Sequence, residues 1–189
     1  MNNDRFLDDR QSQLTIFQRL SGPFLVAVAA VVAFLALALP VQAAGMTQFA
    51  GVGYIPGPGD CTDEVTGPAG QAPDFATLMT GDLEGCVYVF VESFECSPSG
   101  TYRESGTETY VITGGTLGEG TFSTTYIFRG KYEDCADEGF PLGAEIFGRC
   151  QHPIIPGSGT EDFEGVEGRL HFKDDIAAGN FPYTGHMTR

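Results

Sequence analysis

Residues 121–132 read TFSTTYIFRGKY, and this stretch decides the fold class. Its alternate positions separate two kinds of side chain, because Phe122, Tyr126 and Phe128 fall on one side while Arg129 and Lys131 fall on the other. Successive side chains of a strand point to opposite faces, so a period of two indicates a β-strand with one buried side. The stretch therefore predicts a strand whose aromatic side faces the core.

Similar runs lie on both sides of this stretch, separated by clusters of Gly, Pro, Ser and Asp. Many short strands joined by turns are typical of an all-β fold, and closure into a barrel removes the exposed sheet edges. We predict a closed antiparallel up-and-down barrel of about eight strands. The other predicted strands cover residues 47–54, 86–96, 101–112, 144–150, 166–173 and 181–187, with a further one at 75–79 inside the irregular segment 55–80.

An uncharged apolar segment, FLVAVAAVVAFLALAL at residues 24–39, precedes the predicted strands. Arg19 lies before it, and small residues ending in Ala43 follow it. A basic residue, a short apolar core and a small-residue cleavage site are the features of a secretory signal peptide. We expect residues 1–43 to be a signal peptide and residues 44–189 to be a single β-barrel domain.

Cleavage after Ala44 and retention as an uncleaved signal anchor are the alternatives. Residues 23–44 have the length of roughly 20 residues that a membrane helix needs. Acidic residues ahead of the apolar segment, such as Asp4, also weaken the positive bias of the leader. The chain is therefore expected to be secreted or to lie on the exterior of the cell envelope, with a signal-anchored membrane form as the alternative.

The formal charge of the chain is −15, from 10 Lys and Arg against 25 Asp and Glu. Residues 1–43 hold three of the basic and three of the acidic residues, so the predicted domain keeps seven basic and 22 acidic side chains. An acidic surface repels phosphate backbones and anionic lipid headgroups. We therefore expect no nucleic-acid partner, and membrane association only through an uncleaved leader.

The five cysteines all lie in the predicted domain, and they are Cys61, Cys86, Cys96, Cys135 and Cys150. Disulfides are typical of exported proteins, and no pair of these cysteines has the CxxC spacing of a zinc site. An odd number leaves at least one thiol without a partner in the chain. A single buried free cysteine is the simplest outcome.

The up-and-down order restricts the pairing of these cysteines. If the strand from Cys86 to Cys96 runs upward, Cys96 and Cys135 lie at the upper rim, whereas Cys86, Cys150 and the loop with Cys61 lie near the lower rim. Extended strand separates Cys86 from Cys96 by about 33 Å, which is too far for a disulfide. We predict the pair Cys96–Cys135, and we predict that Cys86 bonds either Cys150 or Cys61.

Alternation also selects the side chains that are expected inside the barrel. Glu92 shares a side with the aromatic residues of its strand, which makes it a weak catalytic candidate as an acid–base group in an apolar lumen. The alternative is that a bulge or the strand end turns Glu92 to solvent. The predicted ligand-binding residues are Tyr88, Phe90, Phe94, Phe122, Tyr126 and Phe128.

The three histidines, His152, His171 and His186, are not brought together by the predicted strands. His171 shares a face with Arg169 and Lys173, which favours a solvated outer position. Because nothing places the histidines together, we predict no metal site, and we predict no cofactor. The G-x-S-x-G motif of serine hydrolases is also missing from the sequence, which argues against that class of enzyme.

Residues 157–170, GSGTEDFEGVEGRL, resemble the G-x-G-x-F-x-G-x-x-G signal of the allene oxide cyclase and dirigent-like β-barrel family, here as an exported member of bacterial type. Residues 80–83, TGDL, resemble a segment that leads into a strand in the cyclases. The resemblance implies an eight-stranded antiparallel barrel, often a homo-trimer, whose apolar lumen binds or steers small hydrophobic molecules. Residues 47–54 have neither the Glu nor the Asn that are implicated in the chemistry of the plant cyclases.

Three functions agree with these observations. The first, which we favour, is a non-enzymatic exported barrel that binds a small hydrophobic ligand in an aromatic lumen. The second is a cyclase- or dirigent-like enzyme that steers a reactive hydrophobic intermediate, with Glu92 as its acid–base group. The third is a structural extracellular domain whose lumen is filled by its own side chains, as is common in barrels of about eight strands.

Overall fold

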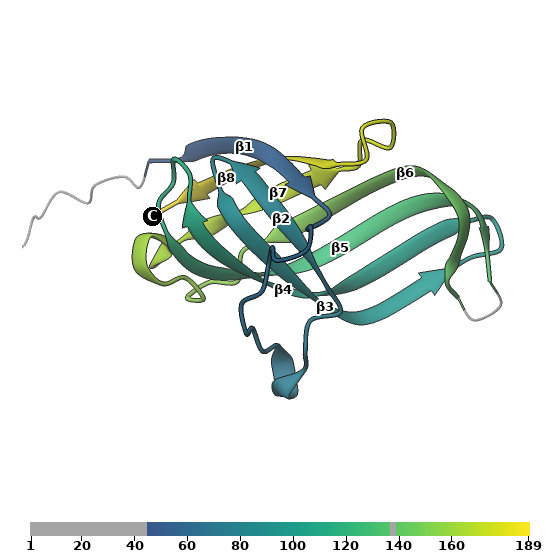
Figure 1. Cartoon of the computed structure of the whole chain (residues 1–189), viewed down its shortest axis with the longest axis horizontal. Coiled ribbons are helices and arrows are strands. Elements are labelled where there is room, and N and C mark those ends of the chain that lie inside the picture. The colour runs from purple at the N-terminus through teal and green to yellow at the C-terminus, as the bar shows by residue number, and fades with distance from the viewer. Residues whose placement is uncertain (1–44, 137–138) are drawn as a thin grey trace, which may run out of the picture. The chain divides into compact units, whose positions relative to one another are not determined.

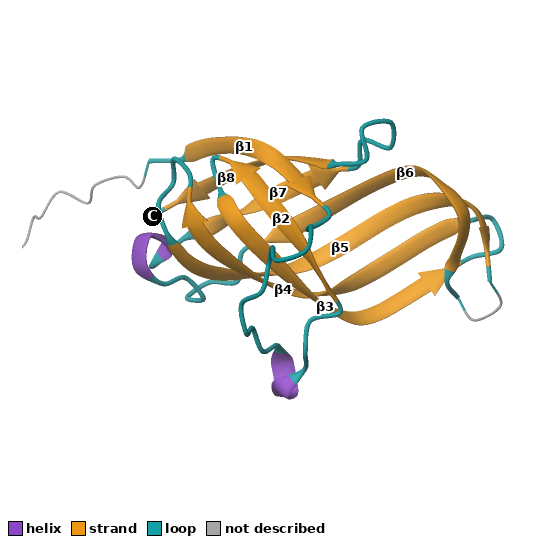
Figure 2. Ribbon diagram, in the orientation of Figure 1, coloured by secondary structure: helices purple, strands orange, loops and turns teal. Residues whose placement is uncertain are grey.

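Each strand of the computed structural model pairs with the next along the chain, and β8 pairs with β1, which closes an eight-stranded antiparallel barrel (Figure 1, Figure 2). The structure describes residues 45–136 and 139–189. The predicted signal peptide and its cleavage site lie outside the described residues. The strands are β1 (Thr47–Tyr54), β2 (Phe75–Gly81), β3 (Glu84–Cys96), β4 (Thr101–Gly114), β5 (Gly120–Cys135), β6 (Pro141–Pro153), β7 (Glu167–Lys173) and β8 (Phe181–Thr188).

The prediction of an all-β, closed up-and-down barrel is confirmed, and each predicted run forms a strand. The run predicted at 75–79 is β2. Two short 3-10 turns, η1 (Pro68–Gly70) and η2 (Glu161–Phe163), are the helical elements of the described ranges. No helix in that part of the chain is long and apolar enough to cross a membrane.

Two glycines of the segment 157–170 are required by the backbone that leads into β7. Gly165 has a φ of +72° in the turn before the strand. Gly168 has a φ of +145°, and a Cβ there would overlap the carbonyl oxygen of His186 on β8. Residues other than glycine rarely adopt either of these two backbone conformations. The glycine spacing of this segment therefore serves the entry into β7 and its pairing with β8.

Aromatic side chains fill one half of the lumen. Tyr110 of β4 and Phe122 of β5 stack with ring centroids 4.4 Å apart and an interplanar angle of 12°. Phe163 of η2 lies 5.1 Å from Phe122, between centroids. All three side chains are fully buried. η2 therefore closes this end of the barrel against a packed core.

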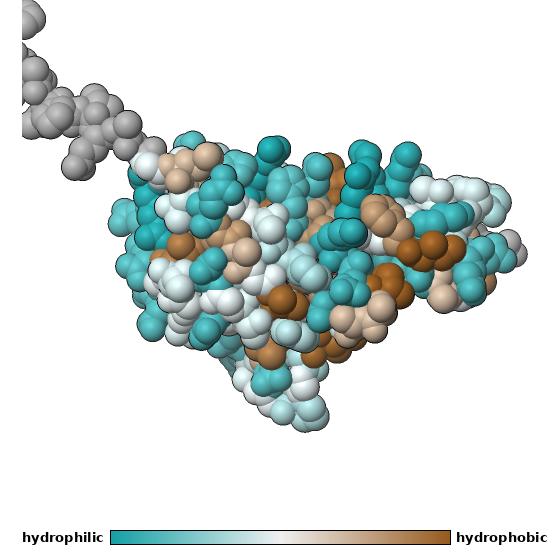
Figure 3. Space-filling model, turned by 90° about the horizontal axis from the view of Figure 1, so that it is seen from above, coloured by the Kyte–Doolittle hydropathy of each residue, from teal (hydrophilic) through white to brown (hydrophobic). Residues whose placement is uncertain are grey.

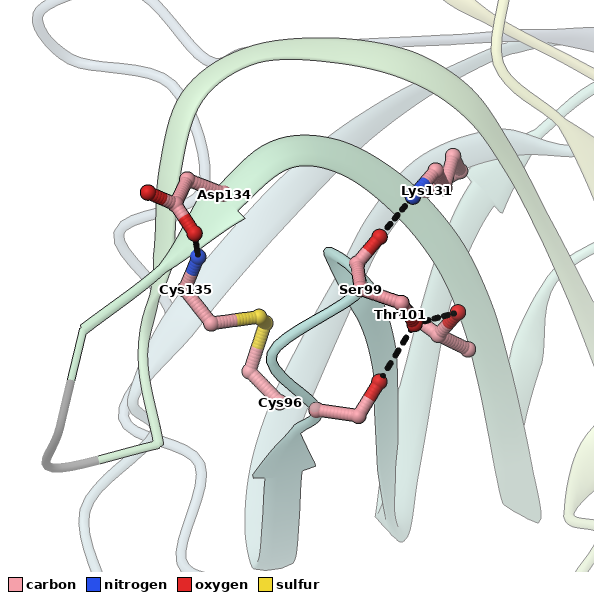
Figure 4. Close-up of a disulfide and its surroundings, with 7 residues drawn as sticks. Cys96, Ser99, Thr101, Lys131, Asp134 and Cys135 are labelled. Atoms are coloured by element: carbon pink, nitrogen blue, oxygen red, sulfur yellow. Dashed lines mark hydrogen bonds between the residues drawn. A yellow bond between two sulfur atoms is a disulfide. The ribbon is translucent and has the colours of Figure 1, made fainter.

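The strands differ in length, and this difference shapes the other half of the lumen. β3 to β6 contain 13 to 16 residues, whereas β1, β2, β7 and β8 contain seven or eight. The four long strands project beyond the short ones as a curved wall (Figure 1). The Cys96–Cys135 disulfide joins β3 to β5 at the tip of this wall, and nearby the Lys131 ammonium donates a hydrogen bond to the carbonyl of Ser99 (Figure 4).

Exposed apolar side chains also lie at this projecting end. Seen from above, hydrophobic side chains gather toward the half of the barrel where the long strands extend (Figure 3). Exposed large apolar residues of the projecting strands and their connections are Phe94, Phe140, Leu142, Ile146 and Phe147. The projecting half therefore has a more apolar exterior than the net charge of the chain would suggest.

Residues 55–74 form a strap over the outer face of β2 and β3. Tyr88 and Phe90 of β3 are buried beneath this 55–74 strap. The Tyr88 hydroxyl donates to Oδ2 of Asp63 at 2.7 Å and accepts from the Asp63 N–H at 2.9 Å. The strap thus creates a second, smaller core on the outside of the barrel.

The prediction that Tyr88 and Phe90 line the lumen is wrong. Val87 and Val89 belong to the core inside the barrel, while the two aromatic residues belong to the core under the strap. β3 is apolar on both faces, as expected for a strand that is covered on both sides. Alternation alone does not decide which of two apolar faces points inward.

The predicted Cys96–Cys135 disulfide is confirmed. The predicted pair Cys86–Cys150 is wrong, because Cys86 bonds Cys61, which was the alternative partner. Cys150 is a buried free cysteine because it lies in the core inside the barrel, whereas Cys86 faces the 55–74 strap. Two disulfides indicate an oxidising compartment.

The hydroxyl of Tyr183 on β8 holds the turn between β2 and β3. It accepts from the Leu83 N–H at 3.1 Å and lies 3.0 Å from the carbonyl oxygen of Thr80, to which it donates. We expect Tyr183→Phe to lower the free energy of unfolding by about 2 kcal/mol, because the buried Leu83 N–H loses its partner. Urea unfolding measures the change, and Tyr54→Phe is the control because Tyr54 is exposed. Equal losses in the two variants would contradict this role of the hydroxyl.

Candidate functional site

The projecting half of the lumen contains a cavity of about 260 Å³. Every strand from β2 to β7 contributes to its wall, as does the start of β8, and no Lys or Arg of the described ranges lines it. The cavity is therefore mainly apolar, with a small set of acidic and neutral polar groups. Its lining residues are Phe75, Thr77, Val87, Val89, Glu104, Glu108, Tyr126, Phe128, Tyr132, Glu145, Cys150, His152, Phe172, Asp174 and Phe181.

The most buried carboxyl group at the cavity is Glu108 of β4, which is 4% exposed. Its Oε2 accepts hydrogen bonds from Thr124 Oγ1 at 2.6 Å and from Tyr110 OH at 3.2 Å. Nδ1 of His152 on β6 lies 2.6 Å from the same oxygen. Buried charges are tolerated when hydrogen bonds satisfy them, and charge-assisted bonds are the strongest of these. Donors from β4, β5 and β6 therefore meet on one carboxylate oxygen.

This contact fixes the role of each nitrogen of His152. Nδ1–H donates to Glu108, so Nε2 is the nitrogen left for another partner. Nε2 is buried and has no hydrogen-bond partner among the described residues. The ring lies 4.7 Å from Phe172 and, nearly parallel, 6.2 Å from Tyr126, between centroids. The cavity thus contains an oriented imidazole whose second nitrogen is unpaired.

A second carboxylate of β4, Glu104, is held by two phenols. Tyr126 OH donates to Oε1 at 2.8 Å, and Tyr102 OH donates to Oε2 at 2.5 Å. Burial, followed by the hydrogen bond to Glu104, raises the pKa of both Tyr126 and Tyr102. Both phenols therefore stay protonated as donors, and Glu104 is engaged within the wall.

A pair of carboxyl groups, Glu145 of β6 and Asp174 just after β7, meets over Gly148. A Cβ on Gly148 would overlap Oε1 of Glu145 and Oδ2 of Asp174. Burial, and then the neighbouring Asp174 carboxyl, raises the pKa of Glu145 to about 7. Burial also raises the pKa of Asp174. The pair therefore shares a proton under mildly acidic conditions.

Cys150 lines the same cavity two residues before His152. Burial, and then the charge of Glu108, raises the pKa of its thiol. The thiolate, not the thiol, is the nucleophile in cysteine chemistry. Cys150 therefore remains a neutral thiol, which argues against a Cys–His nucleophile pair.

Half of the predicted ligand-binding residues lie inside the barrel. Tyr126 and Phe128 line the cavity, and Phe122 lies in the packed core beside it. Phe94 is 41% exposed, with its ring 4.6 Å from that of Phe140, and does not line the cavity, so its prediction as a lumen residue is wrong.

Glu92, the predicted acid–base candidate, is exposed, so the prediction of a lumen carboxylate at this position is wrong. The pairing of β3 with β4 shifts register between Val91 and Ser93, which leaves Glu92 as the extra residue of a β-bulge. The bulge changes the alternation of β3 at this point. Glu92 alternates with the inward-facing Val89 and Val91 as Tyr88 and Phe90 do, so its prediction fails for the same reason as theirs, whereas after the bulge Phe94 lies opposite Glu104 on the inner side of the projecting wall.

Sequence reasoning missed the pair Glu108 and His152. One signal was present, because residues 102–110 read YRESGTETY and place two glutamates on the same side as two tyrosines. The other half of the pair had no local signal. His152 is 44 residues from Glu108 in the chain, and the pairing of β4 with β5 and of β5 with β6 brings the two together.

No protein-family model matches this chain, and comparisons with curated proteins and with solved structures also give no match. Within residues 45–136 and 139–189, no group of three or more His, Cys, Asp or Glu side chains could hold a metal ion. The titratable groups that line the cavity are carboxyl groups, two phenols, one thiol and one imidazole.

The raised pKa of Glu145 makes stability depend on pH. A carboxyl whose pKa is higher in the folded chain binds more protons when folded, so the stability that it contributes is lost as pH rises through the folded-state value. Relative to Glu145→Gln, we expect the wild type to lose unfolding free energy between pH 4.5, the ordinary value, and pH about 7. Urea unfolding across this range measures the difference.

The matched control is Glu164→Gln, which removes a carboxyl on an exposed turn. This variant should follow the pH dependence of the wild type. The assignment to Glu145 would be contradicted if Glu145→Gln and Glu164→Gln had the same pH profile.

Proposed function

We propose that the chain binds a small hydrophobic molecule in the lumen cavity, and that the polar group of this ligand is neutral or cationic. The observation that carries the proposal is an apolar cavity in which Nε2 of His152 is buried without a protein partner. The size of the cavity, its charge and the orientation of His152 each restrict the ligand.

The volume of about 260 Å³ limits the size of the ligand. Sites for drug-sized molecules usually measure roughly 300–1,000 Å³, so this cavity favours a smaller molecule with one or two rings. Val87, Val89, Phe172 and Phe181 offer apolar contacts on several sides. Burial of the ligand's apolar surface against them supplies the main driving force.

The acidic lining argues against an anionic ligand. Glu104, Glu108 and the Glu145–Asp174 pair all line the cavity without a Lys or Arg from the described ranges beside them. A carboxylate on the ligand would face these charges at short range in a low-dielectric site. A cation would instead be attracted to the carboxylates and to the faces of the aromatic rings. Fatty acids and similar anions are therefore disfavoured.

His152 offers the polar anchor. Because Nδ1–H is held by Glu108, Nε2 is the ring nitrogen left to accept from a hydroxyl or amine of the ligand. This atom is buried, so binding requires a small shift of the side chains around the ring. A buried polar atom without a partner costs about 1–3 kcal/mol. A ligand that donates to Nε2 would remove this cost on binding.

Three probes with one ring system test the charge preference. We expect naphthylmethanol and naphthylmethylamine to bind, and naphthoate to bind about tenfold more weakly or not at all, because only the anion is repelled by the lining. Isothermal titration calorimetry measures the affinities. Tightest binding by naphthoate would contradict the proposed ligand class.

Two variants test the location of the ligand. His152→Phe should weaken binding of the alcohol about tenfold through loss of the anchor, whereas His171→Phe, on the outer face of β7, should leave it unchanged. Val89→Phe should block the alcohol and the amine, because a larger side chain fills the cavity. Thermal unfolding checks that each variant is folded. Unchanged affinities in Val89→Phe would place the ligand elsewhere.

The Glu108–His152 contact at 2.6 Å favours a second function, acid–base catalysis. A carboxylate that orients Nδ1 and leaves Nε2 free is the arrangement used by histidine general bases. In the cyclase- or dirigent-like alternative this pair takes the place of Glu92. A ligand recovered by native mass spectrometry would discriminate the two functions. An enzyme converts it and loses conversion in Glu108→Gln, whereas a binding protein returns it unchanged.

Several expectations from the sequence stay predictions. These are the kinship with allene oxide cyclase and dirigent-like barrels, the homo-trimer that it implies, and secretion with a cleaved leader. A closed eight-stranded meander is the fold that this kinship implies. The purely structural alternative fits the packed half of the lumen, but the cavity in the other half favours a binding role.

A further inference from the structure

Four basic residues form one row across the outer face of the sheet. Arg103 of β4 pairs with Arg129 of β5, Arg129 pairs with Arg149 of β6, and Arg149 pairs with Lys173 of β7. All four are exposed, and all alternate with inward residues of their strands. We call these four residues the cationic row.

Positive charge is concentrated on this face. The chain has seven Lys and Arg after residue 43, and Lys131 and Arg169 lie on the outer faces of β5 and β7, so six of the seven belong to strands β4 to β7. The seventh, Arg189, donates to the carbonyl of Leu117. One face is therefore basic in a chain whose net charge is −15.

Little inside the described part of the chain neutralises the cationic row. Arg103 lies 3.4 Å from Glu95 of β3, but both side chains are largely exposed, and such pairs contribute little. Arg129, Arg149 and Lys173 have no ion pair within the described ranges. Like charges directly opposite one another on neighbouring strands repel and destabilise a sheet. The cationic row therefore lowers the stability of the sheet, and its charges are available to bind an external anion.

The spacing of the row describes the anion that it fits. Neighbouring strands lie about 4.8 Å apart, so four charges extend over roughly 14 Å in a line across the strands. Three of them are guanidinium groups, which bind carboxylate or sulfate groups through two parallel hydrogen bonds. The guanidinium of Arg149 lies 5.8 Å from the ring centre of Phe147. An extended chain with regularly repeated anionic groups matches this geometry.

We propose that the cationic row binds an extended anionic polysaccharide that lies across strands β4 to β7. The adjacent outward row toward the packed end of the barrel contains Ser105, Ile127 and Gln151, of which the serine and the glutamine suit sugar hydroxyl groups and the exposed isoleucine suits the apolar face of a sugar ring. The two disulfides indicate an oxidising compartment, where such polymers are found outside cells. A thick, densely charged nucleic-acid duplex would also approach the acidic remainder of the surface and be repelled.

The test compares polygalacturonate, neutral dextran and double-stranded DNA as ligands of the full chain. Polygalacturonate should bind, with an affinity that falls steeply as salt is added because the contacts are exposed and ionic. Dextran should not bind, and DNA should bind at least about tenfold more weakly than polygalacturonate. Equal binding of DNA, or binding of dextran, would overturn the proposal.

Arg129→Gln/Arg149→Gln should weaken polygalacturonate binding by about tenfold or more. It should also raise the midpoint of thermal unfolding, because cross-strand repulsion is relieved. The control is Thr62→Glu/Thr66→Glu, which changes the net charge equally but on the 55–74 strap, where both threonines are exposed. The control should bind like the wild type. An equal loss of polygalacturonate affinity in both variants would show that only the net charge matters. It would reject the cationic row as the binding site.

Discussion

A single buried carboxylate organises the interior of this barrel. Glu108 is surrounded by donors from three consecutive strands, and the closest of them, Thr124 and His152, both lie at 2.6 Å. An ionised carboxylate in this position is tolerated only if such donors are present, and truncating one of them leaves the charge uncompensated. The register of β4 with β5 and that of β5 with β6 are therefore coupled to this cluster. On one side of it lie stacked aromatic rings, and on the other side lies the cavity.

The unequal strand lengths explain why the lumen has these two halves. The short strands β1, β2, β7 and β8 complete the barrel only along part of the length of β3 to β6. Where all eight strands are present, side chains from opposite walls meet and fill the interior, as expected for a barrel of this size. Toward the projecting end the opposite wall recedes, so side chains from β4 to β6 no longer meet partners across the lumen. Space for a ligand follows from this asymmetry.

The fold could be predicted from the sequence because alternation and turn residues are local signals, and every predicted strand is present in the barrel. The site could be predicted only in part. Tyr126 and Phe128 follow the clear alternation of β5, and both reach the cavity. Tyr88, Phe90 and Glu92 were misplaced together, because β3 has two apolar faces and alternation does not say which of them points inward. The bulge of β3 and the packing of the 55–74 strap depend on tertiary contacts, so neither produces a periodic signal in the sequence.

The charge of the chain gives a second example of this limit. The composition fixes a net charge of −15, but it does not say where the charges lie. Arg103, Arg129 and Arg149 come from three different strands, and they become neighbours only through the pairing register. Net charge governs long-range behaviour, whereas local clusters govern contact. The two can have opposite signs on one molecule.

The 55–74 strap makes the outer core separable from the barrel. It adds no strand to the sheet, and it is joined to β3 by the Cys61–Cys86 disulfide and by the contacts of Tyr88 and Phe90. Segments of this kind open at a lower free energy than the whole domain. Backbone amide hydrogens of the strap should thus exchange with solvent independently of those in the eight-stranded sheet. A protease could cut the strap while the ladder of eight strands stays closed, and the covalent link at Cys86 would keep the fragment attached.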